Sequence, residues 1–143
     1  MIVFVCLDTE NGMMFFHRRQ SKDREVRKDI LKMTEAQTLW MNAFTLNQFE
    51  EGEQIFARRN VKVDEAFLEK AQIGEFCFVE DQSLRQFEDK IEKIIIYQWN
   101  REYPADFVFD LKLDSLKWKQ GESFDFAGYS HEKITKTIWE KRV

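Results

Sequence analysis

The segment from residue 17 to residue 28 has the most unusual chemistry in the chain. It holds six Lys or Arg residues and two acids, a local charge of +4 in a protein whose net charge is -4. Arg18 and Arg19 lie just before a predicted helix, where guanidinium groups and free backbone N–H groups can bind a phosphate or a carboxylate together. The segment therefore predicts an anion site. The alternative is a solvated loop whose arginines pair with acids elsewhere.

A second candidate site consists of Trp99, Asn100 and Arg101. These residues follow the apolar run 94–97, which is predicted to be a buried strand. The carboxyl ends of such strands border the ligand crevice in open α/β sheets. Trp99 can stack on a planar ring there, while Asn100 and Arg101 donate hydrogen bonds. The alternative is that Trp99 is a core aromatic, because aromatic residues dominate core packing and make up 15% of this chain.

Two further features lie outside these segments. Asn11 and Gly12 follow the first predicted strand and reach the same edge of the sheet, although a turn alone also explains the pair. His131 stands in a predicted loop, where we expect a surface residue rather than a catalytic base. No His or Cys grouping has metal-ligand spacing and no glycine-rich phosphate motif occurs, so neither a metal nor a cofactor is expected.

The elements that must position these residues begin with strands. The uniformly apolar run 2–7 and the run 93–97, which is apolar after Lys93, are typical of strands buried on both faces of a sheet. Shorter strands are predicted at 38–41 and 75–79. We expect the two long runs to be central parallel strands.

Helices are predicted between these strands from start and stop signals. Ser21 is the predicted cap of the first helix, since Val26 and later apolar residues keep a helical spacing. Thr45 opens a capping-box pattern that leads to a helix ending at Gly52. Another helix begins at about Asp64. A second capping-box pattern begins at Ser83.

The last third of the chain has a different pattern. Apolar and polar residues alternate in 107–113, 123–126 and 134–138, and no helical period lies between these runs. They predict antiparallel strands with one solvated face. The sequence therefore predicts one α/β domain over residues 1–143, with a mixed, mainly parallel central sheet flanked by about four helices and an antiparallel C-terminal portion.

Composition excludes several classes of protein. The chain has 143 residues, 43% hydrophobic, which is enough for a core and too apolar for a disordered segment. The longest apolar run is six residues, so neither a signal peptide nor a membrane span is expected. Cys6 and Cys77 are too few for a disulfide framework, which predicts a cytoplasmic protein. A net charge of -4 gives no general attraction to nucleic acid.

The order of elements and several local strings resemble the dihydrofolate reductase family. That family has Met-Gly-Arg-x-Thr after its second strand, and here Met41 and Thr45 match, whereas Asn42 and Ala43 replace the Gly and Arg. The segment 103–109 also resembles the family's entry to its penultimate strands. The resemblance implies the reductase fold and, with it, a cleft that binds a nicotinamide cofactor and a pterin.

The departures from the family pattern argue against reductase activity. The family's pterin-binding acid aligns with Val26, and Asp23 lies one turn earlier on the same helical face. The family's Gly-Gly, which lets the backbone approach the cofactor, aligns with 95–98, where Ile and Tyr side chains would fill that space. The phosphate-binding Arg is also replaced.

A second resemblance is to a group of short bacterial proteins sometimes labelled ribonuclease Z, through the strings at 17–24 and 99–106. That nuclease chemistry requires a His-x-His-x-Asp-His cluster for two zinc ions. The chain has only His17 and His131 and no such string, so the label is rejected.

We therefore predict a protein that binds a small anionic or heteroaromatic ligand without reductase activity. The predicted site residues are Asn11, Gly12, Arg18, Arg19, Asp23, Trp99, Asn100 and Arg101. Two alternatives stay open: an NADPH-dependent reductase with Asp23 as a displaced acid, and a protein or nucleic-acid interaction module that uses segment 17–28. An edge strand among the last three could also pair two copies into a homodimer.

Overall fold

Two β-sheets form the frame of the molecule. In the computed structural model, which describes residues 1–53, 55 and 58–142, the larger sheet has seven strands in the order β5-β4-β6-β1-β7-β10-β9. The smaller sheet has the order β3-β2-β8. The strands are β1 (Ile2–Leu7), β2 (Gly12–Phe15), β3 (Arg18–Arg19), β4 (Leu39–Met41), β5 (Val61–Val63), β6 (Phe76–Phe78), β7 (Lys93–Gln98), β8 (Phe107–Val108), β9 (Trp118–Phe126) and β10 (Ile134–Lys141).

The helices are short apart from the first. They are the α-helices α1 (Arg24–Met33), α2 (Ala43–Leu46) and α3 (Phe67–Lys70), and the 3-10 helices η1 (Glu51–Glu53) and η3 (Arg85–Lys90). The expected four or so helices thus correspond, within the described residues, to three α-helices and these 3-10 turns.

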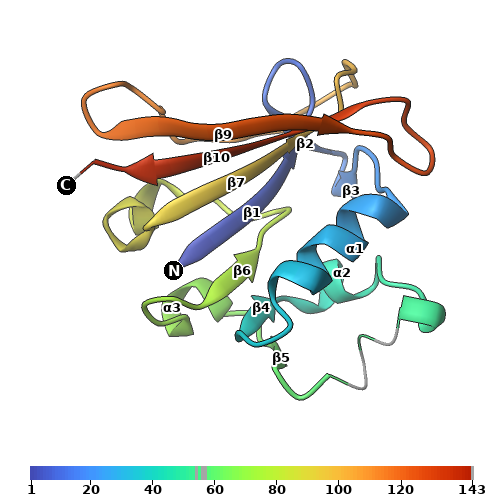
Figure 1. Cartoon of the computed structure of the whole chain (residues 1–143), viewed down its shortest axis with the longest axis horizontal. Coiled ribbons are helices and arrows are strands. Elements are labelled where there is room, and N and C mark those ends of the chain that lie inside the picture. Colours follow the sequence, from blue (N-terminus) through green and yellow to red (C-terminus); the bar gives the residue numbers. More distant parts are fainter. Residues whose placement is uncertain (54, 56–57, 143) are drawn as a thin grey trace.

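Strand pairing confirms the predicted fold class. β1 is central and pairs in parallel with β6 and β7, and β4 pairs in parallel with β5 and β6. β10 is antiparallel to both β7 and β9, so the C-terminal part of the sheet reverses direction. Figure 1 shows β9 and β10 continuing the sheet beyond β7, while β4 and β5 lie at its other end. The apolar runs 2–7 of β1 and 94–97 of β7 follow from this central position, because both faces of these strands are covered.

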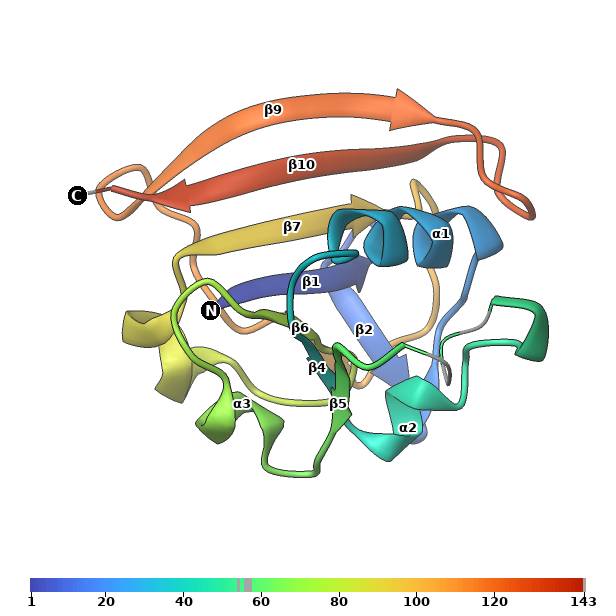
Figure 2. The ribbon, with the colours of Figure 1, turned by 60° about the horizontal axis from the view of Figure 1, so that its bottom comes forward.

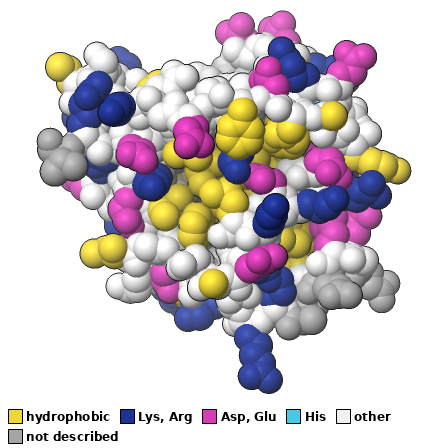
Figure 3. Space-filling view, in the orientation of Figure 1, with side chains coloured by type: hydrophobic (Ala, Val, Ile, Leu, Met, Phe, Trp, Pro, Cys, Tyr) yellow, Lys and Arg dark blue, Asp and Glu magenta, His cyan; other side chains and the backbone are white. Residues whose placement is uncertain are grey.

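The two faces of the large sheet bury separate cores. Val3 and Val5 point to one face, and Phe4 points to the other, where α1 packs against it through Val26 and Ile30. Figure 2 shows α1 lying along β1 and β7 on that face. Hydrophobic side chains also gather at the centre of the surface seen in Figure 3, with acidic and basic side chains around them. The first turns of chain after β1 and β7 are therefore held by packing on both sides.

The N-caps of α1 and α2 differ from the predicted ones. The sequence predicts Ser21 as the cap of the first helix, but the structure has Asp23, whose carboxylate accepts from the Glu25 N–H. Thr45 lies inside α2, and Asn42 caps that helix by accepting from the Thr45 N–H. In both places an Asx residue lies closer to the helix start, and its short side chain competes well for the free N–H groups.

The third predicted cap is also wrong. Ser83 does not cap the 83–86 segment: the carboxylate of Asp110 accepts from the Leu84 and Arg85 N–H groups instead. The predicted helix from Thr45 to Gly52 ends at Leu46, and Gly52 lies within η1. The helix predicted from about Asp64 begins at Phe67.

The small sheet explains why the predicted strand 107–113 is short. Only Phe107 and Val108 form a strand, β8, and it pairs with β2 rather than with the large sheet. The β2–β3 hairpin, which the sequence analysis does not include, turns at Phe16 and His17, whose φ angles are 49° and 60°. Positive φ is uncommon for a Phe residue, so local sequence did not indicate this turn.

Candidate functional site

The turns that follow β1 and β7 lie side by side, as the sequence predicts. The Trp99 N–H donates to the Leu7 carbonyl over 2.9 Å, and the Thr9 N–H donates to the Arg101 carbonyl over 3.0 Å. The two predicted halves of the site, at Asn11 and at Trp99, therefore share one edge of the sheet.

Asp8 fixes the first of these turns, and sequence reasoning did not single it out. It is fully buried and accepts from the Gly12 N–H over 2.7 Å and from the Glu10 N–H over 2.8 Å. Burial alone would raise the pKa of Asp8, but these amide hydrogen bonds outweigh it and lower the pKa. A Cβ at Gly12 would lie 2.5 Å from the Gln20 amide nitrogen, so the chain itself occupies the space beside this glycine.

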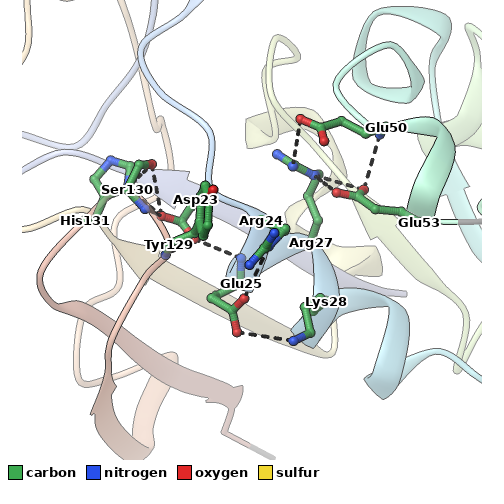
Figure 4. A network of polar contacts seen from close by, with 10 residues as sticks. All are labelled: Asp23, Arg24, Glu25, Arg27, Lys28, Glu50, Glu53, Tyr129, Ser130 and His131. Carbon is green, nitrogen blue, oxygen red and sulfur yellow. Dashed lines mark hydrogen bonds and ion pairs between the residues drawn. The ribbon is translucent and has the colours of Figure 1, made fainter.

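Asp23 is the centre of a polar network that closes over the start of α1 (Figure 4). Its carboxylate accepts from the backbone N–H groups of Tyr129 and Ser130, both over 2.9 Å, and lies 2.8 Å from Nδ1 of His131. Burial raises the pKa of Asp23, but the hydrogen bonds from His131 and these amides lower it more, to about 2. Asp23 therefore binds the β9–β10 loop rather than pointing freely into a cleft.

Trp99 has a partner within the chain as well. Its ring stacks on that of His131, with 4.5 Å between the ring centroids and 21° between the planes. His131 is 8% exposed, which corrects the expectation of a surface residue. Its Nε2 lies 2.8 Å from the hydroxyl oxygen of Ser21. The ring face that was predicted to hold a planar ligand thus holds an imidazole.

The two arginines of the predicted anion site behave differently. Arg19 pairs with the buried carboxylate of Glu80, with Nε 2.9 Å from the nearer oxygen, and lies over the ring of Phe44. Arg18 is exposed. Between Arg19, Ser21 and Trp99 the chain leaves a cavity of about 10 Å³, which is room for roughly one water molecule.

The remaining predicted residues lie at the surface of the same edge. Asn100 adopts a φ angle of 58° and its amide donates to the Lys133 carbonyl and to the Thr135 hydroxyl. Arg101 is exposed. Asn100 thus connects the turn after β7 to β10.

The basic segment 17–28 is largely neutralised by acids. Besides Arg19, Arg27 pairs with Glu53 over 2.7 Å, and Lys28 pairs with Glu25 over 3.5 Å (Figure 4). Arg24 also lies near Glu25 and over the ring of Tyr129. Arg19 and Arg27 thus pair with acids elsewhere in the chain, whereas Arg24 and Lys28 share Glu25 of the same segment, so the alternative describes part of the segment.

A larger cavity of about 340 Å³ lies on the other face of the sheet, away from α1. Its apolar walls come from β1, β7, β10 and the segment after β8. Amide and hydroxyl groups join them at Asn11, Gln98, Gln120 and Thr137, and none of its ten lining residues, all within the described part of the chain, is charged. The lining residues are Leu7, Asn11, Ile96, Gln98, Phe109, Leu111, Leu113, Gln120, Thr137 and Trp139.

Among residues 1–53, 55 and 58–142, no group of three or more His, Cys, Asp or Glu side chains is placed to hold a metal ion. No helix in the same residues is long and apolar enough to cross a membrane.

Comparison with known proteins identifies the fold. No protein-family model matches the chain, and no curated protein matches it. Among solved structures, it is similar to the dihydrofolate reductase from Enterococcus faecalis, solved in complex with NADP(H) and RAB-propyl. The two share 10% sequence identity and a TM-score of 0.67, over 99% of this chain and 96% of that one. The chain therefore has a dihydrofolate reductase-like fold, which confirms the resemblance seen in the sequence.

Proposed function

We propose that the protein binds a small, uncharged heteroaromatic ligand in the 340 Å³ cavity and has no reductase activity. The observation that carries the proposal is the lining of this cavity. Its volume lies in the range of small-molecule sites, which is roughly 300–1,000 Å³. Asn11 is the one predicted site residue that lines it.

The chemistry of the lining selects the kind of ligand. Of the apolar lining residues, Leu113 and Trp139 are partly exposed and can pack against the face of a flat ring. The carboxamides of Asn11 and Gln120 can each donate and accept, which suits the ring nitrogens and exocyclic groups of a heteroaromatic base. An anion finds no countercharge among the lining residues, all of which the structure describes.

The residues around Arg19, the end of β6 and Trp99 do not fit a nicotinamide dinucleotide. Arg19 is already paired with Glu80, and the carboxyl end of β6 continues into the acids Glu80 and Asp81, which repel phosphate. The cavity beside Trp99 holds about 10 Å³, far less than a nicotinamide ring needs. This argues against the alternative in which Asp23 serves a reductase.

Ligand binding is tested by titrating uncharged purines, pterins and nicotinamide into the protein while following backbone amide resonances. We expect shifts at β7, β10 and the segment 109–113. Leu113→Trp, which fills the cavity, should abolish them. Lys112→Trp is the matched control, because Lys112 is exposed and does not line the cavity. The proposal fails if no compound shifts these resonances, or if Leu113→Trp leaves the shifts unchanged.

The two alternative functions have their own tests. A saturable change in NADPH fluorescence on adding the protein would support the reductase, and we expect none. An interaction module based on segment 17–28 predicts binding to nucleic acid that weakens steeply with salt. Since most cations of that segment already have acidic partners, we expect no such binding.

A further inference from the structure

Ser21, His131 and Asp23 are arranged as a nucleophile, a base and an orienting carboxylate. The Ser21 hydroxyl oxygen lies 2.8 Å from Nε2 of His131, and Nδ1 of the same ring lies 2.8 Å from the Asp23 carboxylate. Ser21 and His131 are 110 positions apart in the sequence, so no local motif brings them together. Each distance falls within the range for a working hydrogen bond between catalytic groups.

The arrangement fixes which ring nitrogen carries the proton. Asp23 is ionised at neutral pH, because its pKa is about 2, and an ionised carboxylate only accepts hydrogen bonds. Nδ1 of His131 must therefore donate to Asp23. In the neutral ring this leaves the lone pair of Nε2 directed at the Ser21 hydroxyl, which is the tautomer that a general base requires.

The base is also held in place before any substrate binds. One face of the imidazole stacks on Trp99, and Asp23 is itself fixed by the N–H groups of Tyr129 and Ser130. Such support from a second set of residues keeps a catalytic group in its productive geometry.

We propose that Ser21 is the nucleophile of an acyl-transfer site that hydrolyses small carboxylic esters. The Ser21 oxygen forms a bond to the ester carbonyl carbon while its proton moves to Nε2 of His131. The carbon–oxygen bond to the leaving group then breaks, and the leaving alcohol takes that proton. Water attacks the acyl-serine with His131 as base, which releases the acid and restores the Ser21 hydroxyl.

The surroundings of Ser21 limit the substrate. The cavity beside it, lined by Met13, Val79 and Trp99 among others, is about 10 Å³ and has room for roughly one water molecule, so a small ester must reach Ser21 from its solvent-exposed side. Ser21 is half-buried and keeps part of its surface in solvent, which leaves room for the leaving group outside. The hydroxyl of Tyr103 also lies 3.3 Å from Nε2 of His131.

The proposal is tested on the full chain with a small alkyl fluorophosphonate and with p-nitrophenyl acetate. We expect one label per chain, located on Ser21 by peptide mass, and a burst of p-nitrophenolate. Ser21→Ala should lose both, and His131→Gln should slow labelling by at least about 100-fold. Ser115→Ala is the matched control, because Ser115 is exposed and remote in the fold. Absence of labelling in the folded wild-type protein, or undiminished labelling of Ser21→Ala, overturns the proposal.

Asp23 acts through His131 and is a positioning residue, which Asp23→Asn tests. Asn keeps the N-cap of α1 but favours the wrong imidazole tautomer. We expect labelling to slow by about 10³- to 10⁴-fold. The proton resonance of His131 Nδ1 should also lose its downfield shift while the circular dichroism spectrum stays native. If the labelling rate of Asp23→Asn equals that of wild type, the relay has no catalytic role and the proposal is wrong.

Discussion

Asp23 connects α1 to a loop more than a hundred residues away, and this contact makes stability depend on pH. Its pKa falls from 3.8 to about 2 on folding, because hydrogen bonds outweigh burial. A carboxyl group whose pKa is lower in the folded protein stabilises the fold at any pH above its pKa in the unfolded chain. Asp23 therefore contributes about 2 kcal/mol to the free energy of unfolding above pH ~5, and this contribution is lost as the pH falls through ~2. Asp23→Asn does not titrate, so its free energy of unfolding should fall less between pH 5 and 2. Urea unfolding across this range measures the difference, and parallel curves would contradict it.

The Arg19–Glu80 pair gives a second prediction at this scale. Arg19→Ala leaves Glu80 buried without its countercharge, which should cost about 3 kcal/mol in the free energy of unfolding. Burial already raises the pKa of Glu80 and Arg19 opposes that rise. Without Arg19 the pKa of Glu80 rises further. A carboxyl group whose pKa is raised by folding destabilises the fold at any pH above its pKa in the unfolded chain. The loss should therefore be larger at pH 7 than at pH 4.

Two variants provide the controls for this measurement by urea unfolding. Arg18→Ala, at an exposed site, should change stability by less than about 0.5 kcal/mol. Adding Glu80→Gln to Arg19→Ala should remove the pH dependence of the loss. A loss in Arg19→Ala that stays constant with pH would show that the Glu80 charge is not its cause.

The contacts that the predicted site residues make show what a single sequence can and cannot predict. Composition and spacing correctly indicated an unusual charge density before α1 and an aromatic residue at the end of β7. They could not supply the partners, because Arg19 meets Glu80 and Trp99 meets His131 only after the sheet has formed. The sequence did not predict the burial of His131 for the same reason, because its partner, the carboxylate of Asp23, lies 108 positions away in the sequence.

At the scale of elements, Asn42 shows how a short helix depends on one side chain. Its carbonyl oxygen accepts from the Thr45 N–H over 3.0 Å, and its amide donates to Asp81 over 2.9 Å. Asn42→Ala should lower the free energy of unfolding by about 1–2 kcal/mol. Asn47→Ala is the matched control at an exposed position at the other end of the same helix, and it should have little effect. Equal losses in thermal or urea unfolding would show that the cap has no special role.

The elements themselves differ in how well sequence predicts them. β1 and β7 are recognisable because strands covered on both faces carry continuous apolar runs, here 2–7 and 94–97. Helix N-caps are harder to predict, because several Ser, Thr, Asp or Asn residues lie around each helix start and only one of them reaches the free N–H groups. Asp110 caps η3 from 26 residues away, which no local pattern could show. β2 is defined by its pairing with β3 and β8, so it does not stand out in the sequence alone.

At the scale of the whole molecule, the chain has the dihydrofolate reductase-like fold, but its own side chains pair with one another at the carboxyl ends of the central strands. The imidazole of His131 covers Trp99, and Glu80 takes the charge of Arg19. A fold constrains where a site lies but not its chemistry. With only five glycines in the chain, the backbone offers few places for a dinucleotide to approach it closely.

The free edge of the large sheet decides whether two copies associate. β9 forms one edge, and its exposed residues include Lys119, Glu122 and Asp125, while its register with β10 shifts between Thr137 and Trp139. Charges and bulges of this kind oppose pairing between edges. We therefore expect a monomer of 17.3 kDa by sedimentation, and hydrogen exchange in β9 that does not change with protein concentration. Replacing Lys119 and Glu122 with Thr should promote association. A wild-type dimer whose β9 amides become protected at high concentration would instead establish the homodimer predicted from the sequence.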